Sequence, residues 1–136
     1  MNGMIMRILF AALLISLTCS VTADELQAKL SVKTLITSKL EAINSHKAMV
    51  THVSIPAHFT LPKHFHPSEE FLYVIEGSTI LQIEGQEDQL VKAGMAAKIP
   101  ARAIHTAITE NMPSEVIVFR VHPSGQPVRM SPTEKK

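Results

Sequence analysis

The stretch HFHPSEEFLYVIEG, residues 64–77, places two histidines and two glutamates directly before an apolar run. In an extended chain, alternate side chains point to the same face. His64 and His66 therefore share a face, and the same phase continues to Glu70 rather than to Glu69. One face of the predicted strand thus carries two imidazoles and one carboxylate.

The rest of that face is apolar, because Leu72 and Val74 continue the same phase. Polar groups on a buried face are costly unless they have partners. One divalent cation would satisfy both imidazoles and the carboxylate at once, with a fourth ligand supplied by another strand. The pattern therefore predicts a metal site inside a β structure.

Short apolar runs separated by turn signals continue on both sides of this stretch. Residues 49–55 alternate with a period of two until Pro56, which is typical of a strand. Further strands are predicted over residues 32–40, 70–75, 79–84, 89–91, 96–99, 104–108 and 115–121. Turn signals lie between them, including Glu76-Gly77-Ser78 and Ala93-Gly94. Many short strands at such spacing predict an all-β sandwich or barrel.

The first 23 residues have the three parts of a secretory signal peptide. Arg7 precedes an apolar run over residues 8–17, and Val21-Thr22-Ala23 has small residues where a signal peptidase cleaves. The apolar run is shorter than the roughly 20 residues that a membrane helix needs. We therefore expect an exported protein, periplasmic or secreted, that begins at Asp24 and has no stable membrane insertion.

Composition limits the chemistry of the mature chain. Its one cysteine, Cys19, lies in the predicted signal peptide, so neither a disulfide nor a thiolate ligand is expected. The chain has 13 basic and 12 acidic residues, and cleavage would remove only Arg7 among them, leaving a formal net charge of zero. Without a basic run, no nucleic-acid partner is expected. Any metal must be held by nitrogen and oxygen.

The chain divides into four predicted segments. Residues 1–23 are the signal peptide, and residues 24–46 form an N-terminal arm with an edge strand. Residues 47–123 form the barrel, and the Pro-rich, charged residues 124–136 form a flexible tail.

Two spaced motifs carry a resemblance to a known family: His64-x-His66-x3-Glu70-x6-Gly77 and Gly94-x5-Pro100-x4-His105. The first resembles the first motif of the cupin superfamily, and the second resembles most of its second motif. The resemblance covers residues 48–122. It implies a jelly-roll β-barrel with one metal ion bound by His64, His66, Glu70 and His105. It also implies a homodimer.

Three positions depart from the family pattern. The family's opening glycine falls at His58, the glycine after the second-motif proline at Arg102, and the closing asparagine at Thr109. A non-glycine residue with positive φ costs about 1 kcal/mol, so the turn at Arg102 is either strained or differently shaped. Arg102 is either a solvated residue or a contact for an anionic substrate at the barrel mouth. His58 is a candidate neighbour of the metal ligands.

Three imidazoles and one carboxylate suit Fe(II), Mn(II), Ni(II), Cu(II) or Zn(II), and the sequence does not select among them. Four protein ligands leave two positions open on an octahedral ion, as a dioxygenase, lyase or isomerase requires. Glu70 is the candidate catalytic residue, because a carboxylate that leaves the metal can accept a proton. The expected apolar walls are Leu72, Val74, Ile80, Ile104 and Ala107.

Two functions fit this site. The first is a metal-dependent enzyme that acts on a small oxygenated organic acid. The second is a non-catalytic module that binds a metal or a small molecule. The fold alone does not separate them.

Overall fold

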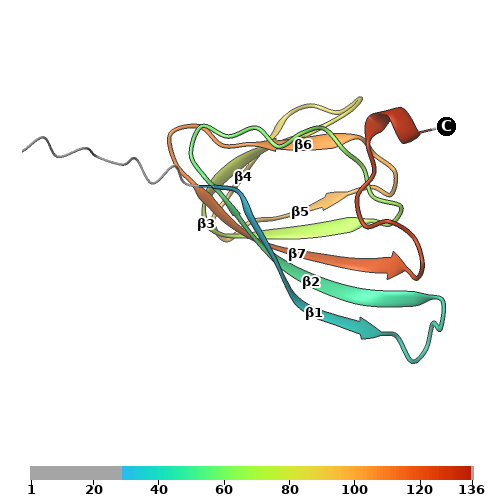
Figure 1. Ribbon diagram of the computed structural model, residues 1–136. Coiled ribbons are helices and arrows are strands. Elements are labelled where there is room, and N and C mark those ends of the chain that lie inside the picture. Colours follow the sequence, from blue (N-terminus) through green and yellow to red (C-terminus); the bar gives the residue numbers. More distant parts are fainter. Residues whose placement is uncertain (1–28, 136) are drawn as a thin grey trace, which may run out of the picture.

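The computed structural model describes residues 29–135, and the predicted signal peptide lies outside them. Within these residues the chain forms seven strands and one short 3-10 helix (Figure 1). They are β1 (Ser31–Lys39), β2 (His46–Ile55), β3 (Glu70–Ile83), β4 (Gln89–Lys92), β5 (Ala96–Ile99), β6 (His105–Ile108), β7 (Ser114–Pro123) and η1 (Pro132–Glu134). The predicted all-β class is confirmed. In this described part, no helix is long and apolar enough to cross a membrane.

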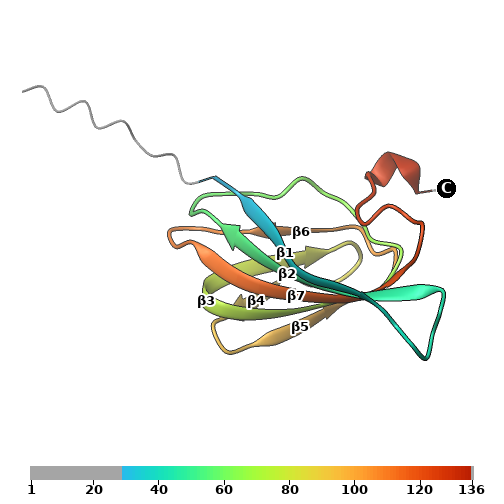
Figure 2. The same ribbon diagram turned by 60° about the horizontal axis from the view of Figure 1, so that its bottom comes forward.

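The strands form two antiparallel layers. The first sheet has the order β1, β2, β7 and the first half of β3, with β5 on the other side of β3. The second half of β3 pairs with β4 and β6 in the second sheet. Figures 1 and 2 show β6 facing the layer formed by β1, β2 and β7. This arrangement confirms the predicted jelly roll.

The sequence predicts two strands separated by a turn at residues 76–78, and this prediction is wrong. The structure has one strand, β3, that passes from the first sheet into the second. Its pairing with β7 shifts register between Val74 and Glu76, and Gly77 has a φ of 73°. A glycine with positive φ is typical of a β-bulge as well as of a turn. The bulge lets one strand serve both sheets.

The core between the two sheets is aliphatic. Alternate residues of β3 and β7 point inward, as the period of two requires. The main buried cluster consists of Ile55, Leu72, Val74, Leu81, Ile83, Val91, Ile99, Val116 and Val118. These side chains pack the closed part of the barrel and hold the strands that carry the polar site.

The C-terminal segment, which composition predicts to be flexible, lies against the barrel. Met130 forms a β-bridge with Phe65, whose backbone N–H donates to Met130 at 3.1 Å and whose carbonyl accepts from Met130 at 3.0 Å. Figure 1 shows this segment, in red, returning over one end of the sandwich. The tail therefore becomes part of the wall around the polar site.

Candidate metal centre

Three of the four predicted ligands meet inside the barrel. His64 and His66 precede β3, and His105 begins β6. His64 and His105 exchange two backbone hydrogen bonds, of 3.1 and 2.9 Å, which places their rings 4.3 Å apart. All three histidines are buried, and one ring nitrogen of each lies within 4.8 Å of the others. These three side chains could bind a metal ion.

The three rings are oriented in the same way. The Nδ1 atoms of His64 and His105 are hydrogen-bonded to the carbonyls of Pro62 and Ala103, each at 2.9 Å. His66 Nδ1 is hydrogen-bonded to the Val128 carbonyl. A carbonyl oxygen only accepts, so each Nδ1 carries the hydrogen and each Nε2 of a neutral ring keeps its lone pair. This is the arrangement that orients histidine ligands in metalloproteins.

Burial keeps two of these rings neutral. It lowers the pKa of His64 to about 3, and the nearby His105 lowers it further in the same direction. Burial also lowers the pKa of His105. Neutral imidazole is the form that binds metal. In addition, His105 Nε2 is buried and has no hydrogen-bond partner among residues 29–135, so a cation would satisfy it.

Glu70 adjoins the three histidines from the start of β3. Its Oε2 accepts hydrogen bonds from Arg120 Nε at 2.8 Å and Arg120 Nη2 at 2.5 Å, and lies 2.9 Å from His66 Nε2. Burial raises the pKa of Glu70, but the hydrogen bond with His66 and the charge of Arg120 together lower it to about 2. The carboxylate is thus ionised beside the site, and its role as fourth ligand stays a prediction.

The contact between His66 and Glu70 also points to a positive partner. With the Nδ1 hydrogen of His66 directed at Val128, its Nε2 and the Glu70 carboxylate would present two lone pairs 2.9 Å apart. Two acceptors at this distance require a proton or a cation between or beside them. The residues present therefore fit a divalent metal held by nitrogen and oxygen.

Sequence reasoning missed Arg120, the partner of Glu70. Arg120 is buried on β7 in the same phase as Val116 and Val118, which are core residues. The signal was an arginine on the inward face of a strand, since a buried guanidinium needs a carboxylate partner.

A cavity of about 290 Å³ opens beside the three histidines. Only Ala107 among the five predicted wall residues lines it; Leu72 and Val74 belong to the packed core instead. After the bulge in β3 the inward phase falls on Thr79 and Leu81, which explains why Ile80 is not a wall. The apolar lining includes Val53, Ile55, Leu61, Leu81, Val116 and Val118. The charged lining residues besides Glu70 are Arg120 and Arg129.

The two residues at the family's glycine positions keep a glycine-like backbone. His58 has a φ of 55° and Arg102 a φ of 60°, so the first of the two expected turn shapes, the strained one, is present. Both side chains are exposed, and neither lines the cavity. The Arg102 guanidinium lies 5.4 Å from the centre of the Phe65 ring. The cation at the cavity edge is Arg129, in the C-terminal segment.

Comparison with known proteins agrees with this geometry. A family model described as a cupin domain matches residues 51–120. The chain belongs to the cupin family. No curated protein matches the chain.

Among solved structures, this cupin is similar to the DMSP lyase DddQ from Ruegeria pomeroyi, with 17% identity and a TM-score of 0.66. That match covers 87% of this chain but only 59% of the lyase. An RmlC-like cupin from Methanocaldococcus jannaschii has 22% identity and a TM-score of 0.60, covering 89% and 94% of the two chains. The polyketide cyclase RemF from Streptomyces resistomycificus has 22% identity and a TM-score of 0.60, covering 76% and 70%. At these identities the likeness establishes the fold.

Proposed function

We propose that this cupin is an exported, metal-dependent enzyme of the dioxygenase, lyase or isomerase type, and that its substrate is a small oxygenated organic acid. The observation that carries the proposal is the set of three buried imidazoles beside an apolar cavity, each with its Nδ1 held by a backbone carbonyl. The lyase and the cyclase among the similar folds are consistent with this class of chemistry.

The charges around the cavity favour an anionic ligand. The charge of Arg120 is balanced by Glu70, and the neutral imidazoles add none. Arg129, at the cavity edge, has no carboxylate within ion-pair distance in the described part of the chain. The site therefore carries an excess positive charge even before a metal binds. A carboxylate group would balance this charge, while an apolar body would contact the valines and leucines of the wall.

His64, His66 and His105 would hold the metal, with Glu70 as the proposed fourth ligand. A bound divalent ion supplies Lewis-acid chemistry and a template for substrate oxygens. Glu70 is the group placed to accept a proton, because its pKa lies well below neutrality and one of its oxygens accepts both bonds from Arg120. Arg120 holds this carboxylate in position and keeps it charged.

The test is to strip the purified protein with a chelator and reload it separately with Fe(II), Mn(II), Ni(II), Cu(II) or Zn(II). Each form is then screened for turnover and oxygen uptake with small carboxylic acids. We expect activity with one ion, and no activity in the double variant His64→Ala, His105→Ala. Turnover by fully metal-free protein would refute the proposal. A ligand that raises the melting temperature without being converted would favour the non-catalytic binding module.

Export is proposed on the sequence of the first 23 residues. If a signal peptidase cleaves after Ala23, mass spectrometry of the protein from its own cells should find a chain that begins at Asp24. An intact Met1 in the soluble fraction of those cells would contradict export.

A further inference from the structure

We propose that residues 126–130 of the C-terminal segment are positioning residues of the metal centre, because they fix the orientation of two of its three histidines. The inference rests on the metal-binding part of the proposed function and not on turnover. It assigns a task to a segment that lies outside both cupin motifs and outside the match to the family model.

The first contact is direct. The Val128 carbonyl accepts the hydrogen bond from His66 Nδ1, across 62 positions of sequence. His64 and His105 instead use carbonyls two residues away in their own loops, Pro62 and Ala103. His66 is therefore the one histidine of the three whose orienting partner comes from a distant segment. Without Val128, the ring of His66 would lose the bond that directs its Nε2 toward the centre.

The second contact acts on His64 through a shared acceptor. Arg129 Nη2 donates to the Pro62 carbonyl at 2.8 Å, and the same oxygen accepts from His64 Nδ1 at 2.9 Å. Pro62 lies in an exposed loop without regular secondary structure. A second donor restrains this carbonyl, so Arg129 helps to keep the His64 ring in its orientation.

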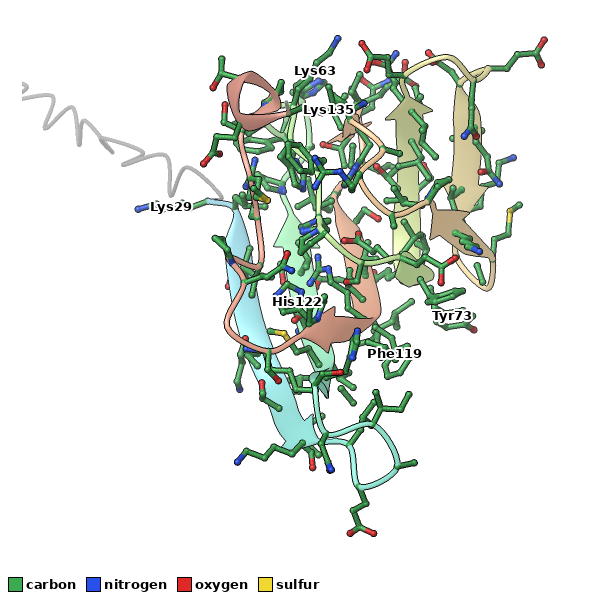
Figure 3. All side chains as sticks on the ribbon, turned by 90° about the vertical axis from the view of Figure 1, so that its right-hand side faces the viewer. Lys29, Lys63, Tyr73, Phe119, His122 and Lys135 are labelled. Atoms are coloured by element: carbon green, nitrogen blue, oxygen red, sulfur yellow. The ribbon has the colours of Figure 1, made fainter. Side chains whose placement is uncertain are left out.

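The segment is held at both ends of these contacts. At its start, the fully buried His122 lies between the end of β7 and the returning chain, and its Nε2 bonds to the Gln126 carbonyl at 3.0 Å (Figure 3). At its end, Met130 pairs through its backbone with Phe65, which lies between His64 and His66 and is itself fully buried. This pairing sets the position of Val128 relative to His66.

A segment that only covers the barrel would affect stability, whereas a segment that orients ligands must also affect metal affinity. Loss of the groups that orient histidine ligands typically weakens metal binding by about 10- to 100-fold. Met130 offers a matched pair of changes. Met130→Pro removes the backbone N–H that donates to Phe65, while Met130→Ala keeps it and removes only the side chain.

The experiment measures Zn²⁺ affinity by competition with a chromophoric chelator, the visible spectrum of the Co²⁺-loaded protein, and the melting temperature of the metal-free protein. We expect Met130→Pro to weaken Zn²⁺ binding by about 10- to 100-fold and to alter the Co²⁺ spectrum. Met130→Ala should stay within about twofold of the unchanged protein. A chain that ends after Gly125 should behave like Met130→Pro, and a chain that lacks only residues 135–136 should behave like the unchanged protein.

Unchanged Zn²⁺ affinity in folded Met130→Pro protein would overturn the inference, as would equal losses in the two Met130 variants. If the chain ending after Gly125 does not fold, the Met130 pair decides alone. Metal binding that depends on the segment, without turnover of any acid, would support the inference and refute the proposed enzyme. Turnover with segment-independent affinity would do the reverse.

Discussion

Glu70 and Glu69 are adjacent in sequence but differ in surroundings. Glu70 is buried and bonded to Arg120, whereas Glu69 is exposed and pairs with Lys98 at 2.5 Å. We expect Glu70→Ala to lower the free energy of unfolding by about 3–5 kcal/mol, because it leaves the Arg120 charge buried without a partner. Glu69→Ala should cost about 0–1 kcal/mol, as is usual for an exposed pair. Urea unfolding measures both.

Equal losses from the two glutamate changes would mean that the strand is shifted by one residue. The double variant Glu70→Ala, Arg120→Met provides the control. It removes both charges, so it should be more stable than Glu70→Ala alone.

The buried histidines make the stability of the metal-free protein depend on pH. The pKa of His64 is about 3 in the folded chain, against 6.5 when exposed, and the pKa of His105 is also lowered. The unfolded chain therefore binds more protons between pH 6.5 and 3, and stability is lost as the pH falls through this range. Glu70, with a pKa lowered to about 2 from 4.5, acts in the same direction at lower pH.

Urea unfolding of chelator-treated protein at pH 7, 5.5 and 4 checks this expectation. The free energy of unfolding should decrease at each step, and the decrease should be smaller in His64→Gln, which removes one of the titrating rings. Stability that is constant over this range would show that the rings are already protonated or are open to solvent.

At the residue scale, sequence spacing predicted more of the site than composition did. The alternation through His64, His66 and Glu70 placed these side chains on the inner face, where the structure has them. Arg120 and Val128 escaped prediction for different reasons. Arg120 carries a readable pattern on β7, but its partner is known only from the pairing of strands. Val128 acts through its backbone carbonyl, which leaves no trace in the identity of its side chain.

At the scale of elements, β3 depends on one glycine. A Cβ added at Gly77 would lie 1.9 Å from the Pro113 carbonyl oxygen, and its φ of 73° is unfavourable for other residues. We expect Gly77→Ala to destabilise the fold by about 2–5 kcal/mol, from the clash and the backbone strain together. Gly85→Ala is the control, because Gly85 has a similar φ of 80° but no atom within 4 Å of the added Cβ.

Gly85→Ala should therefore cost only the backbone strain, about 1–2 kcal/mol. Thermal unfolding of the two variants measures the difference. Similar losses would indicate that the chain at Pro113 moves away freely, so that the close approach at the bulge has no structural weight.

The bulge also shows where local sequence reading ends. Glu76-Gly77-Ser78 has the chemistry of a turn, and the apolar runs on either side have ordinary strand lengths. Whether the chain turns or continues is decided by β7 and β6, which pair with the two halves of β3. Those partners lie about 30 residues or more away in sequence, beyond the range of propensity and periodicity. The strands without such a long-range choice were predicted with ends shifted by only a few residues.

At the scale of the whole molecule, the first sheet has an apolar outer face. Phe71, Tyr73 and Ile75 point outward from β3, and Phe119 points outward from β7 beside Phe71, with the two rings 6.4 Å apart. All four side chains are between 38% and 50% exposed. Figure 3 shows Tyr73 and Phe119 on the same side of the sheet. Contiguous exposed apolar residues of this kind mark interaction surfaces.

The cupin resemblance implies a homodimer, and this face is where we expect the second copy to bind. A stable dimer buries about 1,200–2,000 Å² in total, with aromatic side chains near the centre. Phe119→Glu would place an unpaired charge in that centre and should convert a dimer into a monomer. Leu90→Glu is the control, because Leu90 is 47% exposed on β4 of the other sheet and should leave the assembly unchanged. Light scattering at micromolar concentration measures the mass of each form. A monomeric unchanged protein would refute the dimer, and dissociation by Leu90→Glu instead would move the interface to the second sheet.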